Sequence, residues 1–376
     1  MLFGGISAMN KIIRASLRAL ILGFTLSLAA GCTTMLRDPV PMARIDEASF
    51  GTKTPIRYWG DQLPAAYANA FRRDKHILSL SGGGLNGAYG AGYLTGWSAR
   101  GNRPNFDLVT GISVGAMIAP LAFLGPRYDP RLHAILSQVN TDHIAGPGFL
   151  AVLFGAPALA DNTPVKRAIA YIIDEETLAA IAAEHRKGRR LLVGTTNLDA
   201  ERPVVWDIGA IANSNIPNKL ELVRQIILAS AALPGFFPPV LIEVTIDGKQ
   251  YDELHVDGGI TQQFVMLPGG GQGAKSQGTL YAIYNGTTQP SPQIVKATGL
   301  SVLGRAVPTL LKYRDRGDVR ELENTARAYG ITYHLAAIPG GFPETPTKNA
   351  QIQAWLNDLY ALGLQHGNAG SWQSSR

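Results

Sequence analysis

Val109-Thr110-Gly111-Ile112-Ser113-Val114-Gly115 is the stretch that decides the fold of this chain. We expect an apolar strand before it, from Phe106 to Val109, and a helix after it, from Ala116 to Leu124. Gly-x-Ser-x-Gly between a strand and a helix is typical of a nucleophile elbow, in which a sharp turn lifts the serine hydroxyl to the helix N-terminus. Ser113 is therefore a candidate nucleophile, and Gly111 and Gly115 leave room for the turn. On the pattern alone, a glycine-rich turn capped by Ser113 is the open alternative.

A second glycine-rich turn precedes the elbow. The apolar run from His76 to Leu80 predicts a buried parallel strand, and it leads into Ser81-Gly82-Gly83-Gly84-Leu85-Asn86-Gly87 and a helix from Ala88 to Trp97. Consecutive glycines expose main-chain N–H groups, which suit either a phosphate or an oxyanion. Gly82, Gly84 and Gly87 formally meet the dinucleotide spacing, but no acidic residue follows where a ribose would need it. The sequence thus favours an oxyanion hole over a nucleotide site.

The rest of the chain alternates between predicted strands and helices. Further strands are expected at 191–197, 203–206, 241–246, 251–256, 280–284 and 331–335, and further helices at 130–139, 164–173, 175–185, 220–232 and 351–364. Asp247-Gly248 indicates a hairpin between two of these strands. This alternation predicts one domain over residues 71–366, a three-layer α/β/α sandwich with a mostly parallel central sheet. Residues 367–376 are expected to form a flexible polar tail.

Composition excludes several classes of function. The 376 residues carry 34 Lys and Arg against 28 Asp and Glu, a formal net charge of +6. Three of these cations, Lys11, Arg14 and Arg18, lie in a segment that we expect to be removed. The remaining charge is small, and no basic stripe with interleaved aromatic residues is present, so nucleic acid is not an expected partner. No metal or cofactor is expected either.

The N-terminus has the pattern of an export signal. The three cations are followed by an uncharged apolar stretch, Ala19 to Ala30, which is short for a membrane span. Small residues then precede Cys32, the one cysteine of the chain. Residues 1–31 resemble a bacterial lipoprotein signal, which implies cleavage before Cys32, lipid attachment there, and the outer membrane of a Gram-negative bacterium as the location. Residues 32–70 would form a tether and domain edge. An ordinary cleaved signal followed by an unmodified thiol is the alternative.

Two later stretches complete a recognisable order of motifs. Asp257-Gly258-Gly259 follows a predicted strand, and Ala229-Ser230-Ala231-Ala232-Leu233-Pro234-Gly235-Phe236-Phe237-Pro238-Pro239-Val240 lies before it. Together with the two glycine-rich turns, over roughly Lys75 to Ile260, these stretches resemble the patatin-like phospholipases. The resemblance implies a lipid acyl hydrolase, of phospholipase A or lysophospholipase type, which cleaves lipid carboxylic esters through an acyl-enzyme and needs no metal. It assigns Ser113 as the nucleophile, Asp257 as the base, and Gly82, Gly83 and Gly84 as the oxyanion donors.

The residue types fit this chemistry, with one departure. A serine hydroxyl needs a base, and a carboxylate serves if burial raises its pKa; Gly258 and Gly259 let the backbone turn and bring Asp257 close. The family usually has Arg or Lys two residues after the third glycine, where this chain has Asn86. Without that cation, a neutral ester or lysolipid is as suitable a substrate as a diacyl phospholipid.

Two rival hypotheses remain from the sequence. The first is a Ser–Asp–His triad, with His334 or His366 as the base; we expect His334 to be a core residue and His366 to be solvated. His255, two residues before Asp257, would lie on the same side of a strand and tune the base. The second rival is a non-catalytic outer-membrane lipoprotein that binds lipid on a degenerate hydrolase scaffold.

Overall fold

The computed structural model describes residues 35–64, 66–67, 75–137, 162–267, 278–346 and 349–373. The chain divides into two compact units, 1–38 and 39–376, and the description below concerns the second. The predicted signal segment 1–31 and Cys32 lie outside the described residues. Among the residues that are described, no helix combines the length and the hydropathy needed to cross a membrane.

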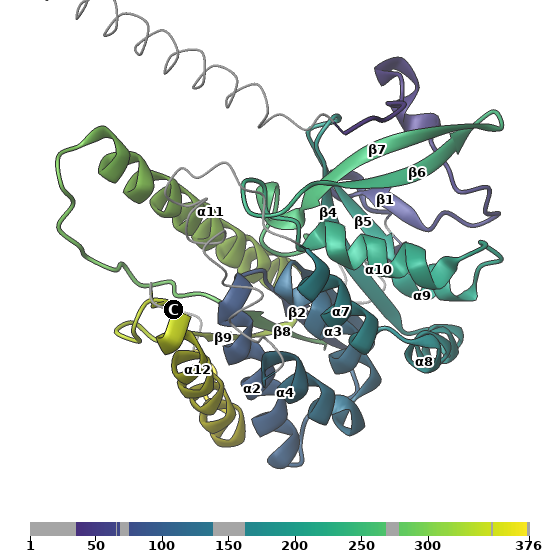
Figure 1. The fold of residues 1–376 in the computed structure, drawn as a ribbon. Helices are drawn as coiled ribbons and strands as arrows, with labels where there is room; N and C mark the ends of the chain where they lie inside the picture. The colour runs from purple at the N-terminus through teal and green to yellow at the C-terminus, as the bar shows by residue number, and fades with distance from the viewer. Residues whose placement is uncertain are drawn as a thin grey trace, which may run out of the picture. The chain divides into compact units, whose positions relative to one another are not determined.

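Nine strands form one sheet (Figure 1). They are β1 (Arg57–Trp59), β2 (His76–Leu80), β3 (Leu108–Ile112), β4 (Arg190–Asn197), β5 (Arg202–Asp207), β6 (Val240–Ile246), β7 (Lys249–Asp257), β8 (Thr279–Tyr284) and β9 (Thr332–Ala337). The main path runs β1-β5-β4-β3-β2-β8-β9, and the five strands from β4 to β9 along it are mutually parallel. β5 pairs antiparallel with both β1 and β4, and the β6–β7 hairpin joins the sheet through an antiparallel pairing of β7 with β4. The predicted mostly parallel sheet is confirmed, with antiparallel strands at one side.

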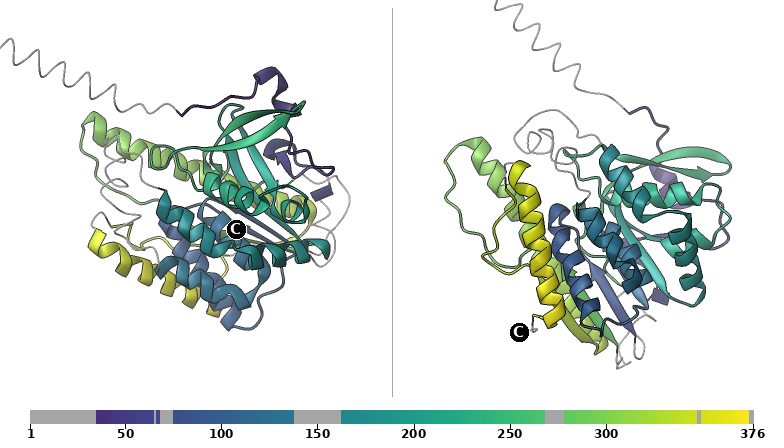
Figure 2. Two further views of the ribbon diagram at one scale, coloured as in Figure 1. Left: turned by 45° about the vertical axis from the view of Figure 1, so that its right-hand side comes forward. Right: turned by 60° about the horizontal axis from the view of Figure 1, so that its bottom comes forward.

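Helices cover both faces of this sheet (Figures 1 and 2). The α-helices with described residues are α2 (Gly87–Ala99), α3 (Val114–Leu124), α4 (Asp129–Ser137), α7 (Thr163–Ile172), α8 (Glu175–Arg186), α9 (Ile208–Asn213), α10 (Lys219–Ser230), α11 (Gly299–Tyr329) and α12 (Asn349–Ala369). Alternate strand residues point to opposite faces. Leu78 and Val109 therefore share a core with α2, α3, α10 and α12, while Ile77 and Leu108 share another with the C-terminal half of α11. The three-layer prediction is thus correct.

Local sequence signals explain most of the boundaries. Asp174 caps α8 by accepting a hydrogen bond from the N–H of Thr177 over 2.8 Å, as its position predicts. Asp247 and Gly248 both adopt positive φ, 49° and 78°, and form the tight turn between β6 and β7. The six-residue helix α9 was not predicted, because its span is short and Asp207, which caps it, also ends a strand.

The predicted flexible tail is wrong for residues 367–373. Helix α12 extends to Ala369 and runs alongside α2. Beyond it, the Trp372 ring packs 4.9 Å from the rings of Tyr93 and Trp97. The N–H of Gln373 donates to the carbonyl of Leu335 in β9 over 2.7 Å. An aromatic anchor and one strand-like hydrogen bond thus hold a segment whose polar composition alone suggested a frayed end.

Candidate active site

Ser113 lies in a strained turn between β3 and α3. Its backbone has φ 55° and ψ −125°, a region that side-chain-bearing residues rarely adopt. The turn brings the start of α3 against the adjacent strand, so that a Cβ atom on Gly115 would lie 2.5 Å from the carbonyl oxygen of Leu80. Gly111 has equally little room, because its position faces the main chain of Gly115. The fully buried strand β3 leads directly into this turn, so its geometry is that of a nucleophile elbow.

Asp257 is the hydrogen-bond partner of the Ser113 side chain. The serine Oγ donates to Oδ2 of Asp257 over 2.7 Å, and the N–H of Gly259 donates to Oδ1 over 2.7 Å. The carboxylate is 4% exposed. Burial raises the pKa of Asp257 to about 6, while the bonds from Ser113 and Gly259 and the charge of Arg314 act in the opposite direction. A carboxylate with this pKa is well placed to accept a proton near neutral pH.

The branch in the sheet brings Asp257 to the elbow. β7 pairs with the end of β4, with Asp257 opposite Thr195, and Asp257 is the last residue of its strand. Gly258 then packs on β4, where a Cβ atom would lie 2.5 Å from the carbonyl oxygen of Gly194. The short 3₁₀ turn Gly258–Ile260 begins there, and the carboxylate of Asp257 caps it by accepting a hydrogen bond from the N–H of Gly259. The nucleophile and the carboxylate therefore reach one point from two different strands beside β4.

Ser230 links the elbow to the same strand. Its Oγ accepts a hydrogen bond from the N–H of Ser113 over 2.9 Å and donates to the carbonyl of Gly194 over 2.6 Å. The side chain is fully buried at the end of α10. Ser230 belongs to the family-like stretch 229–240, but its role could not be predicted from the sequence. The sequence feature that could have identified this contact is a single serine between alanines at the end of an apolar predicted helix.

The second glycine-rich turn lies beside Ser113. Gly83 and Gly84 have φ values of 142° and 56°, which favour glycine. Gly82 is buried close to the nucleophile, because a Cβ atom there would lie 3.1 Å from Cβ of Ser113. Within the described parts of the chain, no acceptor takes a hydrogen bond from the N–H groups of Gly82, Gly83 and Gly84. Main-chain N–H groups in this position are able to stabilise a negatively charged oxygen beside Oγ of Ser113.

Asn285, which the sequence analysis missed, holds this turn in shape. Its side chain donates to the carbonyl of Ser81 over 3.0 Å and accepts from the N–H of Gly90 over 3.1 Å. Its own N–H donates to Oγ of Ser81 over 2.8 Å, and that hydroxyl donates to the carbonyl of Gly82. Asn285 follows β8 at the carboxyl edge of the sheet, where polar residues commonly belong to a site. A polar residue directly after a predicted strand was the sequence feature that could have marked Asn285 as part of the site.

Helix α11 supports the turn after Asp257. The guanidinium of Arg314 donates to the carbonyls of Gly259 and Ile260, the latter over 3.1 Å, and pairs with Asp315 over 2.7 Å. One turn later, Asp318 accepts a hydrogen bond from the N–H of Gln263 over 2.6 Å. A cation thus lies near the carboxylate, although it comes from α11 and not from the glycine turn, where Asn86 replaces the usual basic residue.

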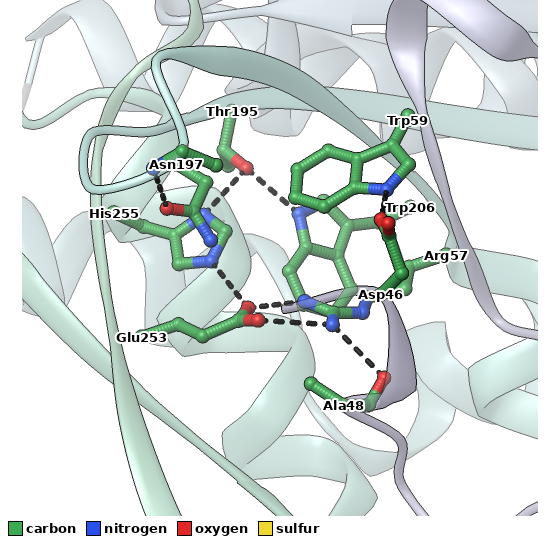
Figure 3. A network of polar contacts seen from close by, with 10 residues as sticks. Asp46, Ala48, Arg57, Trp59, Thr195, Asn197, Trp206, Glu253 and His255 are labelled. Carbon is green, nitrogen blue, oxygen red and sulfur yellow. Dashed lines mark hydrogen bonds and ion pairs between the residues drawn. The ribbon is translucent and has the colours of Figure 1, made fainter. Parts of the chain in front are cut away.

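His255 does not tune Asp257, contrary to the expectation from its position. It belongs to a separate buried network (Figure 3). Its Nδ1 lies 3.0 Å from Oγ1 of Thr195, which also accepts from the indole of Trp206. Because the carboxylate of Glu253 can only accept and the ring is neutral, the ring proton lies on Nε2, and Nδ1 accepts from Thr195. Nε2 donates to Glu253 over 3.1 Å. Burial lowers the pKa of His255 and would raise that of Glu253, but the bond from His255 and the charge of Arg57 hold the pKa of Glu253 at about 2.

Neither of the other candidate histidines contacts the dyad. His334 lies on β9 and stacks on Tyr281 with ring centroids 5.3 Å apart, as a packed residue, and burial lowers its pKa. His366 was expected to be solvated, but it is half-buried, and its Nδ1 lies 3.1 Å from the hydroxyl of Tyr89 in α2. The geometry brings Ser113 and Asp257 together without a histidine between them.

A model of the patatin-like phospholipase family matches residues 78–266, which is half of the chain and contains both Ser113 and Asp257. The chain belongs to the patatin-like phospholipase family. Family membership supports lipid acyl hydrolase activity in general terms, with a lipid as the fitting substrate. No curated protein sequence matches the chain.

Two solved structures resemble this patatin-like chain distantly. The structure of VipD from Legionella pneumophila is 14% identical, with a TM-score of 0.35, over 91% of this chain and 73% of that one. The heterodimeric complex of ExoU and SpcU from the type III secretion system of Pseudomonas aeruginosa is 15% identical, with a TM-score of 0.31, over 80% of this chain and 53% of that one. The family assignment stands on the match over residues 78–266.

Proposed function

We propose that this protein is a serine lipid acyl hydrolase of phospholipase A or lysophospholipase type, in which Ser113 is the nucleophile and Asp257 the base. The observation that carries the proposal is the 2.7 Å hydrogen bond from the Ser113 hydroxyl to the Asp257 carboxylate. It joins a hydroxyl held in a strained turn to a buried base with a raised pKa, which is the arrangement that serine acyl transfer requires.

Acylation follows from this arrangement. Oγ of Ser113 attacks the carbonyl carbon of a lipid ester while Asp257 takes the hydroxyl proton. The negative charge that develops on the carbonyl oxygen is stabilised by the N–H groups of Gly82, Gly83 and Gly84, and one such donor contributes about 3 kcal/mol to lowering the barrier. When the tetrahedral intermediate collapses, the ester C–O bond breaks. The leaving alcohol takes the proton from Asp257, and the acyl chain remains on Ser113.

Deacylation repeats the same steps with water. Asp257 accepts a proton from a water molecule as its oxygen attacks the acyl-enzyme carbonyl, and the same N–H groups stabilise the second oxyanion. Collapse of this intermediate returns the proton to Oγ of Ser113 and releases the fatty acid. One carboxylate therefore serves as base and acid in turn, and its raised pKa makes both directions of proton transfer accessible.

A lipid-panel assay with four proteins tests this proposal. Wild type, Ser113→Ala, Asp257→Asn and His334→Ala are supplied with phosphatidylcholine, phosphatidylglycerol, lysolipids and neutral acylglycerols, and fatty acid release is measured. We expect Ser113→Ala and Asp257→Asn to lose activity and His334→Ala to keep it. Loss of activity in His334→Ala would instead indicate a histidine base, and with it a triad; retention of activity in Asp257→Asn would show that Asp257 is not the base. The panel also decides whether a diacyl phospholipid, a lysolipid or a neutral ester is preferred, which the Asn86 substitution leaves open.

A fluorophosphonate probe separates the catalytic role from a binding role. An activated Ser113 labels covalently, and Ser113→Ala does not. If folded wild-type protein in detergent failed to label, the non-catalytic lipid-binding alternative would replace the proposal.

We further propose that the mature protein is exported and anchored by lipid at Cys32, at the outer membrane of a Gram-negative bacterium. The support is the sequence of residues 1–32, with its basic start, its short apolar stretch and its cysteine. Metabolic labelling with a fatty acid, compared between wild type and Cys32→Ser, tests the anchor. Fractionation of the labelled cells into inner and outer membranes tests the location. Equal labelling of both proteins would exclude a lipid at Cys32.

A further inference from the structure

Helix α11 consists of two halves with opposite surroundings. In the C-terminal half, Val319, Leu322, Ala326 and Tyr329 are buried against the sheet. The N-terminal half lies beyond the sheet at the upper left of Figure 1, and every side chain described between residues 301 and 313 is at least partly exposed. A helix half without a buried side chain receives no stabilisation from a core, so its apolar residues need another explanation.

Large apolar side chains are exposed along one face of this half. Leu303, Val307 and Leu310 follow the i, i+4, i+7 spacing that places residues in one row, and they are 60%, 48% and 70% exposed. Val302 and Tyr313 flank the row, and Ile294, in the preceding segment, is almost fully exposed. We call these six residues the apolar face of α11. Such a concentration is unusual for a surface that meets only water, and it marks an interaction site.

The charge around the apolar face is positive. Not one acidic residue occurs from Gly286 to Arg314, whereas Lys296, Arg305 and Lys312 lie in that span. The hydrogen bonds of Arg305 and Lys312 run to neutral groups of Ser291 and Gln293, so they leave the charge in place. Acidic residues begin again at Asp315, in the half that packs on the sheet. Arg305 and Lys312 each follow a member of the row by two residues, which places them on the opposite side of the helix. An apolar face with unneutralised cations on the opposite, polar side is the pattern of a helix that lies in the surface of an anionic membrane.

The apolar face ends next to the candidate active site. Tyr313, its last member, precedes Arg314, whose guanidinium holds the carbonyls of Gly259 and Ile260 after Asp257. A lipid surface that binds the apolar face therefore lies one helical turn from the residues that support the base. A lipid molecule in that surface would therefore lie close to Ser113 and Asp257 and could reach them without first leaving the membrane.

We propose that the apolar face of α11 is a docking surface for an anionic lipid membrane. The inference extends the proposed function, because it names the physical form in which the substrate is met, but its test does not require catalysis. Apolar side chains enter the boundary between headgroups and acyl chains. Arg305 and Lys312, on the polar side of the helix, and Lys296, in the segment before it, attract the headgroup phosphates.

The test uses a dye placed on the surface itself. The full-length protein carries Cys32→Ser, which removes the native thiol and the proposed anchor, and Ser113→Ala, which prevents hydrolysis of the vesicles. Leu310→Cys then accepts an environment-sensitive fluorophore on the apolar face. Leu364→Cys, at a 38% exposed leucine on α12, is the matched control. Vesicles are made of phosphatidylcholine, with or without phosphatidylglycerol.

We expect a blue shift and a rise in fluorescence for the dye at position 310 when phosphatidylglycerol vesicles are added, a smaller change with pure phosphatidylcholine, and none at position 364. Adding Leu303→Ser to the labelled protein should weaken the apparent vesicle affinity by about tenfold. An unchanged dye at position 310, or equal changes at both positions, would overturn the proposal. A shift that follows protein concentration without vesicles would overturn it in favour of a second copy of the chain.

Hydrolysis of a soluble short-chain ester by unlabelled wild type and Leu303→Ser separates this inference from the proposed function. If docking fails, the ester is still cleaved by both proteins while the dye does not respond. If the proposed function fails, no ester is cleaved while the dye still reports vesicle binding. Retained ester hydrolysis by Leu303→Ser, with reduced activity on vesicles, is the result that docking predicts.

Discussion

Oγ of Ser113 donates to Oδ2 of Asp257 over 2.7 Å, while Oδ1 of the same carboxylate accepts the N–H of Gly259 over 2.7 Å. Each oxygen of the buried carboxylate therefore has a defined partner, and only one of the two faces the nucleophile. The bond to Gly259 fixes the rotation of the carboxylate, so that Oδ2 is directed at the serine proton.

The hydrolysis rate should fall on the acid side of a pKa of about 6. Asp257 accepts a proton only when it is ionised, and burial raises its pKa to about 6. The measurement is kcat/KM for a soluble ester from pH 4 to pH 8, which reports the free enzyme. A rate that stayed constant down to pH 4 would show that Asp257 is not the base.

Asp257→Asn should gain stability relative to wild type as the pH rises from about 4 to about 6. The ordinary carboxyl pKa of 3.8 applies to the unfolded chain, and the folded value is about 6. Between these values the folded wild type holds a proton that the unfolded chain has lost, so its stability falls as the pH rises, by on the order of 3 kcal/mol in full. The uncharged amide does not titrate. Chemical denaturation of both proteins at pH 4, 5, 6 and 7 measures the difference, and a difference independent of pH would contradict the raised pKa.

Ser230→Ala should lower kcat by about 10- to 100-fold and reduce stability. The change leaves the N–H of Ser113 and the carbonyl of Gly194 without the hydroxyl that bridges them, and it loosens the elbow. Initial rates and thermal unfolding are compared with Ser214→Ala, whose hydroxyl bonds the carbonyl of Ile211 at the end of α9. Equal rates in the two variants would show that Ser230 does not position the nucleophile.

Arg314→Gln should move the acid limb of the pH–rate profile to higher pH. The positive charge of Arg314 lowers the pKa of Asp257, and its loss leaves burial less opposed. Arg314→Lys keeps the charge but loses the double hydrogen bond to the carbonyls of Gly259 and Ile260. We therefore expect its acid limb to lie close to that of wild type, while its kcat stays below the wild-type value. Arg320→Gln, on an exposed position of the same helix, is the control. A limb that moved equally in the control would assign the effect to overall charge.

Sequence was sufficient for features that are local in the chain. The elbow around Ser113 and the turn at Asp247 and Gly248 each depend on neighbouring residues, and both were predicted in place. The layer arrangement also followed, because apolar runs of strand length between helical segments leave few alternatives. Helix α9 and the end of α12 were missed for the converse reason: short or polar segments are held by contacts that their own composition does not reveal.

The supporting residues around the dyad depend on pairings across the chain. Asn285 meets Ser81 because β8 lies next to β2, and Arg314 meets Gly259 because α11 crosses that edge of the sheet. His255 shows the same limit from the other direction. Its distance of two residues from Asp257 suggested a shared environment. Instead, His255 contacts Thr195 and Glu253 through its ring nitrogens and packs against the ring of Trp206. The spacing of residues along a strand predicts the face of the sheet on which a side chain lies, but it does not predict which residues the side chain contacts.

The pairing of β7 with β4 has a consequence for the chain during its synthesis. Ser113 is made 144 residues before Asp257, and β4 is finished before the hairpin that carries the carboxylate exists. A ribosome-bound chain that ends before β7 can build the elbow but has no acceptor for the serine proton. Arg314 and Asn285 come later still. On the proposed mechanism, reactivity is therefore withheld from a chain that ends before β7, and it can arise only after the β6–β7 hairpin has joined β4.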